Sequence, residues 1–152
     1  MKASHSNMGP VARVLIVEDF PAFRRFICST LGKSLDLRVI AEVSDGLEAV
    51  HKAAELKPDL ILLDIGLPTI NGIEAARQIC KFSPESKIVF LSQETSAEVV
   101  GEALSTGAWG YVVKAKAATQ LLAVVDAVLQ GRPVNTLLGN FPFHPSPLMR
   151  FI

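Results

Sequence analysis

Residues 59–64 read DLILLD and lead into a loop, IGLPTING, at residues 65–72. A continuous apolar run of this kind predicts a strand buried on both faces, as in a parallel sheet. The proline, asparagine and glycines of the loop are typical turn formers and end the strand. Asp64 therefore stands at the end of a buried strand, where an ionised group is costly unless it has partners.

On both sides of this stretch, strand patterns alternate with helix patterns. Further strands are predicted at residues 12–19 (ARVLIVED), 37–43 (LRVIAEV), 87–92 (KIVFLS) and 109–114 (WGYVVK). Apolar residues at helical spacing predict helices at residues 21–31, 45–56, 71–82, 96–107 and 117–131. The expected buried stripes are Phe23, Phe26, Ile27, Thr30 and Leu31 in the first helix, Leu47, Val50, Ala54 and as a further candidate Ala53 in the second, and Ala118, Leu121, Leu122, Val125, Val128 and Leu129 in the fifth.

Five strands alternating with five helices predict an α/β fold, a doubly wound parallel sheet of five strands with helices on both faces. The 152 residues suit one compact domain, which we place at residues 11–131. Residues 1–10 are polar and contain glycine and proline, so a flexible N-terminal arm is expected there. Residues 132–152 form a C-terminal tail without a second helical period.

Composition excludes several classes of protein. Lys plus Arg and Asp plus Glu number 15 each, so the zero net charge gives no electrostatic reason for nonspecific binding to nucleic acid or to an anionic membrane. No apolar run is long enough to span a bilayer and the first ten residues contain no signal-peptide core, so a cytoplasmic protein is expected. Cys28 and Cys80 lie among apolar residues in helical patterns, which indicates two core thiols rather than a disulfide.

Polar residues follow four of the predicted strands. Glu18 and Asp19 follow the first, Asp64 the third, Ser92 the fourth and Lys114 the fifth. Parallel sheets bind ligands at the carboxyl ends of their strands, so these side chains are expected to converge. Three carboxylates in one place need a cation, and hard oxygen ligands without His or Cys favour Mg²⁺ over zinc. A carboxylate can also attack phosphorus, while Mg²⁺, an ammonium group and a hydroxyl would stabilise the developing charge.

The stretches ARVLIVEDF, LLDIGLPTINGIEA, VFLS and GAWGYVVKA resemble the response-regulator receiver domain of two-component signalling, across residues 12–131. The resemblance implies a flavodoxin-like fold with strand order 2-1-3-4-5. It implies that Asp64 is the phosphoacceptor, and that Asp19, Asp64 and the Gly66 carbonyl bind Mg²⁺, with Glu18 acting through a water molecule.

The resemblance further implies that Ser92 is the switch hydroxyl, Tyr111 the switch aromatic residue and Lys114 the phosphate-binding lysine. The partner would be a sensor histidine kinase or a phosphotransfer protein in a bacterial cell. The domain would be a signalling switch rather than an enzyme, with slow autodephosphorylation. A phosphoryl group on Asp64 would draw in Ser92 and let Tyr111 turn inward. The face formed by the fourth helix, fifth strand and fifth helix would then change, and a homodimer could form through it.

Two residues depart from the family's usual pattern. Gln93 follows Ser92 where a small residue is usual, so we expect it to hinder access and to slow both phosphorylation and hydrolysis. Ala115 follows Lys114 where many members have a cis proline, and a cis bond here would cost about 3 kcal/mol. A trans peptide bond is therefore expected at this position.

Alternative interpretations remain for single residues. Asp64 could simply form a turn, and Lys114 could be a solvated charge. Helix capping could explain Glu18, Asp19 or Ser92. Packing in the core could explain Tyr111 and Trp109. A haloacid-dehalogenase-like phosphatase would need a second Asp where this chain has Gly66, and no G-x-G-x-x-G loop follows the first strand for a dinucleotide.

A helix-turn-helix, which often follows receivers of this branch, needs about 50 residues or more with a basic face. Residues 132–152 cannot supply it, so no direct contact with nucleic acid is expected from this chain, which is either a stand-alone receiver or a truncated regulator. The tail would pack on its own domain or on a partner, or it would be disordered.

Overall fold

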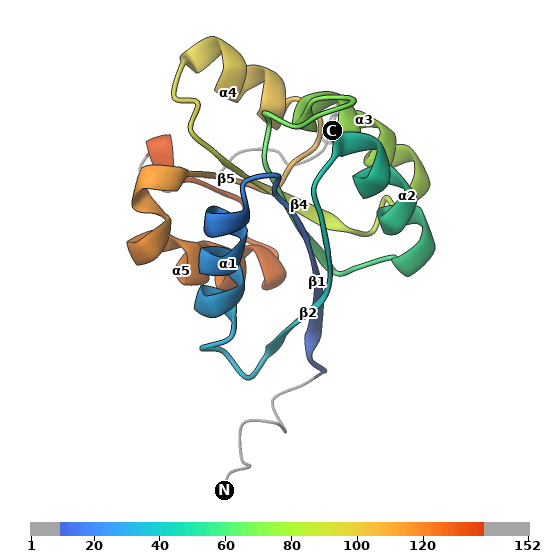
Figure 1. Ribbon diagram of the computed structural model, residues 1–152. Helices are drawn as coiled ribbons and strands as arrows, with labels where there is room; N and C mark the ends of the chain where they lie inside the picture. Colours follow the sequence, from blue (N-terminus) through green and yellow to red (C-terminus); the bar gives the residue numbers. More distant parts are fainter. Residues whose placement is uncertain (1–9, 139–152) are drawn as a thin grey trace, which may run out of the picture.

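A computed structural model describes residues 10–138 of the chain (Figure 1). The elements are, in order, β1 (Ala12–Val17), α1 (Pro21–Leu31), β2 (Leu37–Val43), α2 (Gly46–Leu56), β3 (Leu60–Leu63), α3 (Gly72–Phe82), β4 (Lys87–Ser92), α4 (Ala97–Leu104), β5 (Gly110–Val113), a 3-10 turn (Lys114–Lys116), α5 (Ala117–Leu129), β6 (Val134–Asn135) and a second 3-10 turn (Thr136–Leu138). The predicted alternation of strands and helices is confirmed. The predicted arm lies outside the described residues except for Pro10, as does the tail beyond Leu138.

Within the described residues the sheet has six parallel strands in the order β2-β1-β3-β4-β5-β6. The first five positions confirm the order that the resemblance implies, but the prediction of five strands is wrong by one. The sixth strand pairs Val134 with Gly110 and Asn135 with Tyr111, along the outer edge of β5. A strand of two residues is too short to show alternation, which explains why the sequence pattern did not indicate it.

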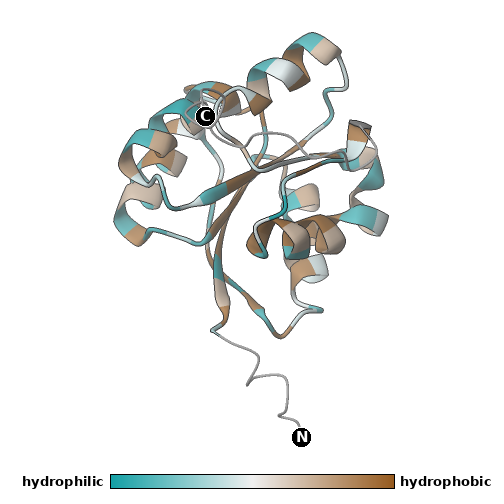
Figure 2. Ribbon diagram, turned by 180° about the vertical axis from the view of Figure 1, so that it is seen from behind, coloured by the Kyte–Doolittle hydropathy of each residue, from teal (hydrophilic) through white to brown (hydrophobic). Residues whose placement is uncertain are grey.

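Helices cover both faces of the sheet (Figure 1). Helices α1 and α5 lie on one face, over a core that includes Ile16, Leu62 and Val112. Helices α2, α3 and α4 lie on the other face, over a core that includes Leu63 and Phe90. The strands between these layers are largely hydrophobic (Figure 2), as expected for a sheet buried on both sides.

The edge strand β2 is less regular than the central strands. Its pairing with β1 shifts register between Val14 and Leu15. It also carries the charged residues Arg38 and Glu42, and most of its side chains are partly or fully exposed. Strand β2 is therefore a solvated edge rather than a fully buried strand.

Two predicted helix faces need correction. In α2, Leu47 is 41% exposed and Ala54 is only half-buried, while Ala49, Val50 and Ala53 face the core. The prediction of Val50 and Ala53 is confirmed, and the packing of α2 on the sheet buries Ala49 in place of Leu47. In α5, Ala118 is exposed; the residues buried there are Ala117, Leu121, Val124, Val125 and Val128.

Side-chain caps fix where three helices begin. The Asp45 carboxylate accepts a hydrogen bond from Glu48 N at the start of α2. The Asn71 side chain accepts from the backbone of Ile73 and Glu74 at the start of α3, and Ser96 accepts from Val99 N at the start of α4. Each cap satisfies backbone donors that a helix leaves unpaired. The caps of α2 and α3 also bring these helix ends next to the loop that follows β3.

Several smaller predictions can be checked as well. Cys28 and Cys80 form no disulfide and pack at opposite faces of the sheet. No cis peptide bond occurs between residues 10 and 138, so the bond to Ala115 is trans as predicted. Trp109 packs against the core beneath α1 and α5. None of the described helices is long and apolar enough to cross a membrane.

Candidate functional site

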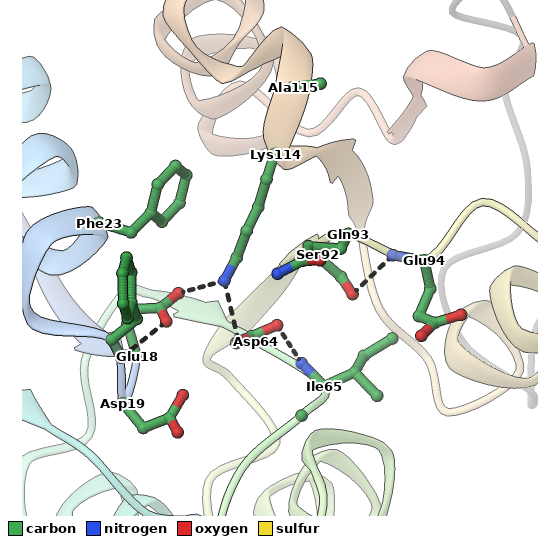
Figure 3. Close-up of a pocket in the computed structure, with 12 residues that line it drawn as sticks. Glu18, Asp19, Phe23, Asp64, Ile65, Ser92, Gln93, Glu94, Lys114 and Ala115 are labelled. Carbon is green, nitrogen blue, oxygen red and sulfur yellow. Dashed lines mark hydrogen bonds and ion pairs between the residues drawn. The ribbon is translucent and has the colours of Figure 1, made fainter.

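A cavity of about 700 Å³ opens at the carboxyl ends of the strands (Figure 3). Four of the strands each deliver at least one of the predicted side chains to it. The residues that line it are Glu18, Asp19, Phe20, Phe23, Asp64, Ile65, Gly66, Ser92, Gln93, Glu94, Lys114 and Ala115. Of the predicted site residues, only Tyr111 does not line the cavity.

Lys114 is the central charge of this cavity. Its Nζ lies 2.9 Å from Glu18 Oε1 and 3.0 Å from Asp64 Oδ2. Burial alone would lower the pKa of Lys114, but the hydrogen bonds and the charges of Glu18 and Asp64 outweigh burial and raise it. The ammonium group therefore stays protonated and is held between two carboxylates.

Glu18 is the most deeply buried acid of the site, with only 1% of its surface exposed. Burial raises its pKa, while Lys114 and the backbone N–H of Phe20 act in the opposite direction. Its Oε2 accepts a hydrogen bond of 3.0 Å from Phe20 N, and its carbonyl accepts one of 2.8 Å from Arg24. Among residues 10–138, no hydrogen-bond donor is aligned with Oε1, although Lys114 Nζ is close enough for an ion pair.

The acidic residues have the geometry of a cation site. Glu18, Asp19 and Asp64 each offer a carboxylate oxygen, and these oxygens lie within 4.8 Å of one another. Asp19 is exposed at the cavity mouth, and Gly66 lines the cavity beside it. A cluster of carboxylate oxygens this close together, with no His or Cys among them, fits a hard divalent cation.

Asp64 is held from behind by the start of α3. Its Oδ1 accepts a hydrogen bond of 2.7 Å from Ile65 N, and its own N–H donates to Val17 O at 3.1 Å. The Gly72 N–H donates to Ile65 O at 2.7 Å. A Cβ at Gly72 would stand 1.9 Å from the Asp64 carbonyl oxygen, so the backbone at Gly72 packs directly against that of Asp64.

The start of α2 holds the other end of the same loop. The Gly46 N–H donates to Pro68 O at 3.0 Å, and a Cβ at Gly46 would stand 2.1 Å from Ile70 O. Sequence reasoning missed Gly46 and Gly72 as residues of functional importance. The signal was present in the pairs Asp45-Gly46 and Asn71-Gly72, in which a helix cap precedes a glycine.

Ser92 and Tyr111 meet at the loop between β4 and α4. The Ser92 Oγ accepts a hydrogen bond of 3.2 Å from Glu94 N, and the Tyr111 hydroxyl donates one of 2.9 Å to Glu94 O. Tyr111 is completely buried, and burial is the main cause of its raised pKa. The Tyr111 ring therefore occupies the inward position in this structure, and the expected response of Tyr111 to phosphorylation stays a prediction.

Two phenylalanines of the cavity wall were not predicted as site residues. Phe20 is 61% exposed at the cavity mouth. Phe23 was expected only as part of the buried stripe of α1, but its ring lies 4.8 Å from Lys114 Nζ (Figure 3). Gln93 is exposed and lines the cavity next to Ser92.

Comparisons with known proteins agree with this arrangement. The family model described as the response regulator receiver domain matches residues 14–126. The chain is 40% identical over 102 residues to the chemotaxis protein CheY of Thermotoga maritima, covering 67% of this chain and 84% of that protein. It is 35% identical over 121 residues to the transcriptional regulatory protein LiaR of Bacillus subtilis, covering 80% of this chain and 57% of that one.

Solved structures give the same result. The response regulator domain of Thermotoga maritima CheB superposes with a TM-score of 0.74 at 34% identity, covering 81% of this chain and 99% of that one. A LuxR-family response regulator from Aurantimonas gives a TM-score of 0.80 at 28% identity, with 86% and 94% covered. The chain spans about half to two thirds of the length of the regulators LiaR, DegU and ExaE. By sequence and by fold, the chain belongs to the response regulator receiver domain family.

Proposed function

We propose that Asp64 is the residue that accepts the phosphoryl group. A carboxylate oxygen of Asp64 would form a bond to phosphorus while the bond from phosphorus to the donor breaks, and the donor leaves with that electron pair. The observation that carries the proposal is the ion pair between Asp64 Oδ2 and Lys114 Nζ, 3.0 Å long, in a cavity lined by three further acidic residues, Glu18, Asp19 and Glu94. Phosphoryl transfer depends mainly on such positioning and charge stabilisation.

Asp19, Asp64 and the Gly66 carbonyl would bind Mg²⁺, with Glu18 acting through a water molecule. The bound ion would neutralise charge on the phosphoryl oxygens and on the crowded carboxylates. The close approach of the three acids, within 4.8 Å, supports this part of the proposal.

Lys114 and Ser92 would bind the oxygens of the transferred group. Lys114 already contacts Asp64 and needs only a small shift to pair with a phosphoryl oxygen. The Ser92 Oγ accepts from Glu94 N, and its hydroxyl would donate its own proton to a phosphoryl oxygen. Both residues stabilise charge that develops during the reaction, which is where binding energy increases rate.

Gln93 would slow the reaction in both directions. Its side chain is exposed and stands at the cavity wall directly after Ser92, where its volume hinders the phosphodonor and the attacking water. A tenfold change in rate needs only about 1.4 kcal/mol, so a modest steric effect is sufficient. The variant Gln93→Ala should therefore both acquire and lose the phosphoryl group faster.

The phosphodonor that we propose is a histidine kinase or a phosphotransfer protein in the cytoplasm. The target that we propose is a protein that binds the face formed by α4, β5 and α5. Because Tyr111 is already inward, phosphorylation would act on the loop of Ser92, Gln93 and Glu94, which the Tyr111 hydroxyl holds through Glu94 O. A phosphoryl group shifts this loop only as far as it binds one conformation better than another. A homodimer through the same face is one form that the output could take.

The test is phosphorylation of the full chain by acetyl phosphate or phosphoramidate with Mg²⁺, followed by intact mass. The parent should gain one phosphoryl group, and Asp64→Asn should gain none. Asp59→Asn is the matched control, because Asp59 flanks the same strand at its other end and accepts a hydrogen bond from Arg13 N. Labelling of Asp64→Asn at the parental rate would rule out the assignment.

A further inference from the structure

The Lys114 ammonium group has three neighbours of different chemistry. Its Nζ forms ion pairs with Glu18 and Asp64, as described above, and the third neighbour is the ring of Phe23, with its centroid 4.8 Å from Nζ. Figure 3 shows this ring beside the lysine, on the side away from Ser92. Only 12% of the Lys114 side chain is exposed, so little water competes for the cation.

The Phe23 ring is itself held in place. It is half-buried on α1, and its ring centroid lies 5.3 Å from that of Phe26, at an interplanar angle of 32°. It also packs against the core beneath α1 and α5. A fixed ring can act on the position of a flexible lysine chain, whereas a mobile ring would only follow it.

The face of an aromatic ring attracts a cation because of its quadrupole, and the attraction is larger where water is excluded. Unlike a carboxylate, the ring attracts the cation through its quadrupole and not through a lone pair that accepts a directed hydrogen bond. Phe23 can therefore hold the charge in place while carboxylate and phosphoryl oxygens serve as the hydrogen-bond acceptors of the ammonium.

We propose that Phe23 is a positioning residue for the phosphoryl transfer, acting through Lys114; this inference rests on the proposed function. During transfer, Lys114 has to exchange part of its contact with Asp64 for phosphoryl oxygens, so that contact weakens as the reaction proceeds. The attraction to Phe23 does not depend on that exchange. The ring thus keeps the ammonium beside the reacting atoms both before and after the phosphorus–oxygen bond forms.

The chain contains a second contact of the same kind that is remote from the cavity. Lys87 Nζ lies 4.5 Å from the centroid of the Trp109 ring, and it also donates a hydrogen bond to Val128 O. Neither residue lines the cavity at the carboxyl ends of the strands. This pair is a matched control, because weakening it changes a cation–ring contact without touching the site.

The experiment replaces Phe23 in the full chain with phenylalanines that carry one, two or three ring fluorines. Fluorine reduces the negative electrostatic potential of the ring face and changes the shape of the ring little. The rate of labelling of Asp64 by phosphoramidate with Mg²⁺ should fall stepwise with fluorine number, by about 2- to 10-fold in total. The melting temperature should stay constant, Phe23→Tyr should keep the parental rate, and Phe23→Leu should be at least as slow as the most fluorinated form. Fluorination of Trp109 should leave the rate unchanged.

A rate that is independent of fluorine number, in a parent protein that is labelled normally, would overturn the role of Phe23 and leave the role of Asp64 intact. A rate that falls only in parallel with the melting temperature would also overturn it, because Phe23 would then be a packing residue. A parent that acquires no phosphoryl group on Asp64 would overturn the proposed function, and the role of Phe23 with it.

Discussion

Replacing Gly72 with alanine should damage the site through the backbone of Asp64. The new Cβ would stand 1.9 Å from the Asp64 carbonyl oxygen and 2.8 Å from the Ile65 Cα. An ordinary van der Waals contact begins near 3.4 Å, so the closest pair is about 1.5 Å too close. Both neighbours are backbone atoms, so no side-chain rotation can relieve the clash.

The size of the effect follows from this geometry. To remove the clash, α3 and the end of β3 would have to separate by roughly an ångström. Overpacking of this kind lowers the free energy of unfolding by about 1–3 kcal/mol or more. The hydrogen bond from Gly72 N to Ile65 O, 2.7 Å long, would also be strained. A displacement of about 1 Å at a reacting group can lower a rate by about 100-fold. We therefore expect Gly72→Ala to be folded, less stable and severely slowed in phosphorylation.

Urea unfolding and the rate of labelling by phosphoramidate measure the two effects separately. The control is Gly101→Ala in α4, where the new Cβ would meet no described atom within 4 Å apart from the glycine, its chain neighbours and the backbone of its own helix. In a helix interior this change should stabilise by up to about 1 kcal/mol and leave the labelling rate unchanged. If Gly72→Ala unfolds at the parental urea concentration and is labelled at the parental rate, the packing argument is wrong.

Three further predictions concern the metal, a thiol and the edge of the sheet. Mg²⁺ should raise the melting temperature of the parent protein. At a Mg²⁺ concentration 100 times the dissociation constant, the free energy of unfolding should increase by about 2.7 kcal/mol, and Asp19→Asn should lose most of this increase. An equal response in the variant would exclude Asp19 as a ligand. Burial, with the nearby Glu42, raises the pKa of Cys28 to about 11. Alkylation of this thiol by iodoacetamide should therefore be slow at pH 8 and should accelerate as the pH approaches 11. A rate at pH 8 equal to that of free cysteine would contradict this. Val134→Ala should lower the free energy of unfolding in urea by about 1 kcal/mol, because Val134 is only 8% exposed. The labelling rate should not change, because β6 is remote from the cavity. No loss of stability would mean that β6 does not contribute to the stability of the sheet.

The residues that could be predicted are those whose position follows from strand alternation alone. Asp64 and Lys114 each come directly after an apolar run, and parallel strands bring such residues to one edge of the sheet. The convergence of these polar residues could therefore be predicted from the sequence. Tyr111 was also visible, but its inward position depends on the loop of Glu94, which no periodicity describes.

The residues that could not be predicted depend on contacts between distant parts of the chain. Phe23 has the spacing of an ordinary core residue, and only the packing of α1 against the sheet brings its ring to Lys114. Gly72 looks like a turn residue, and only the approach of α3 to β3 makes its lack of a side chain essential. In α2, the apolar pattern favoured Leu47, which is exposed, and did not indicate Ala49, which packing against the sheet buries.

The two edges of the sheet determine how the protein can associate with other chains. An exposed, long and flat edge strand invites pairing with another backbone, which leads to aggregation. One edge here, β2, is interrupted by a register shift and carries Arg38 and Glu42, and the other edge, β6, is only two residues long. Within residues 10–138, neither edge offers a long, flat template for pairing with another sheet. We therefore expect this part of the chain to associate through side chains on its helices, where a single substitution can adjust the contact, and not by continuing its sheet into a second molecule.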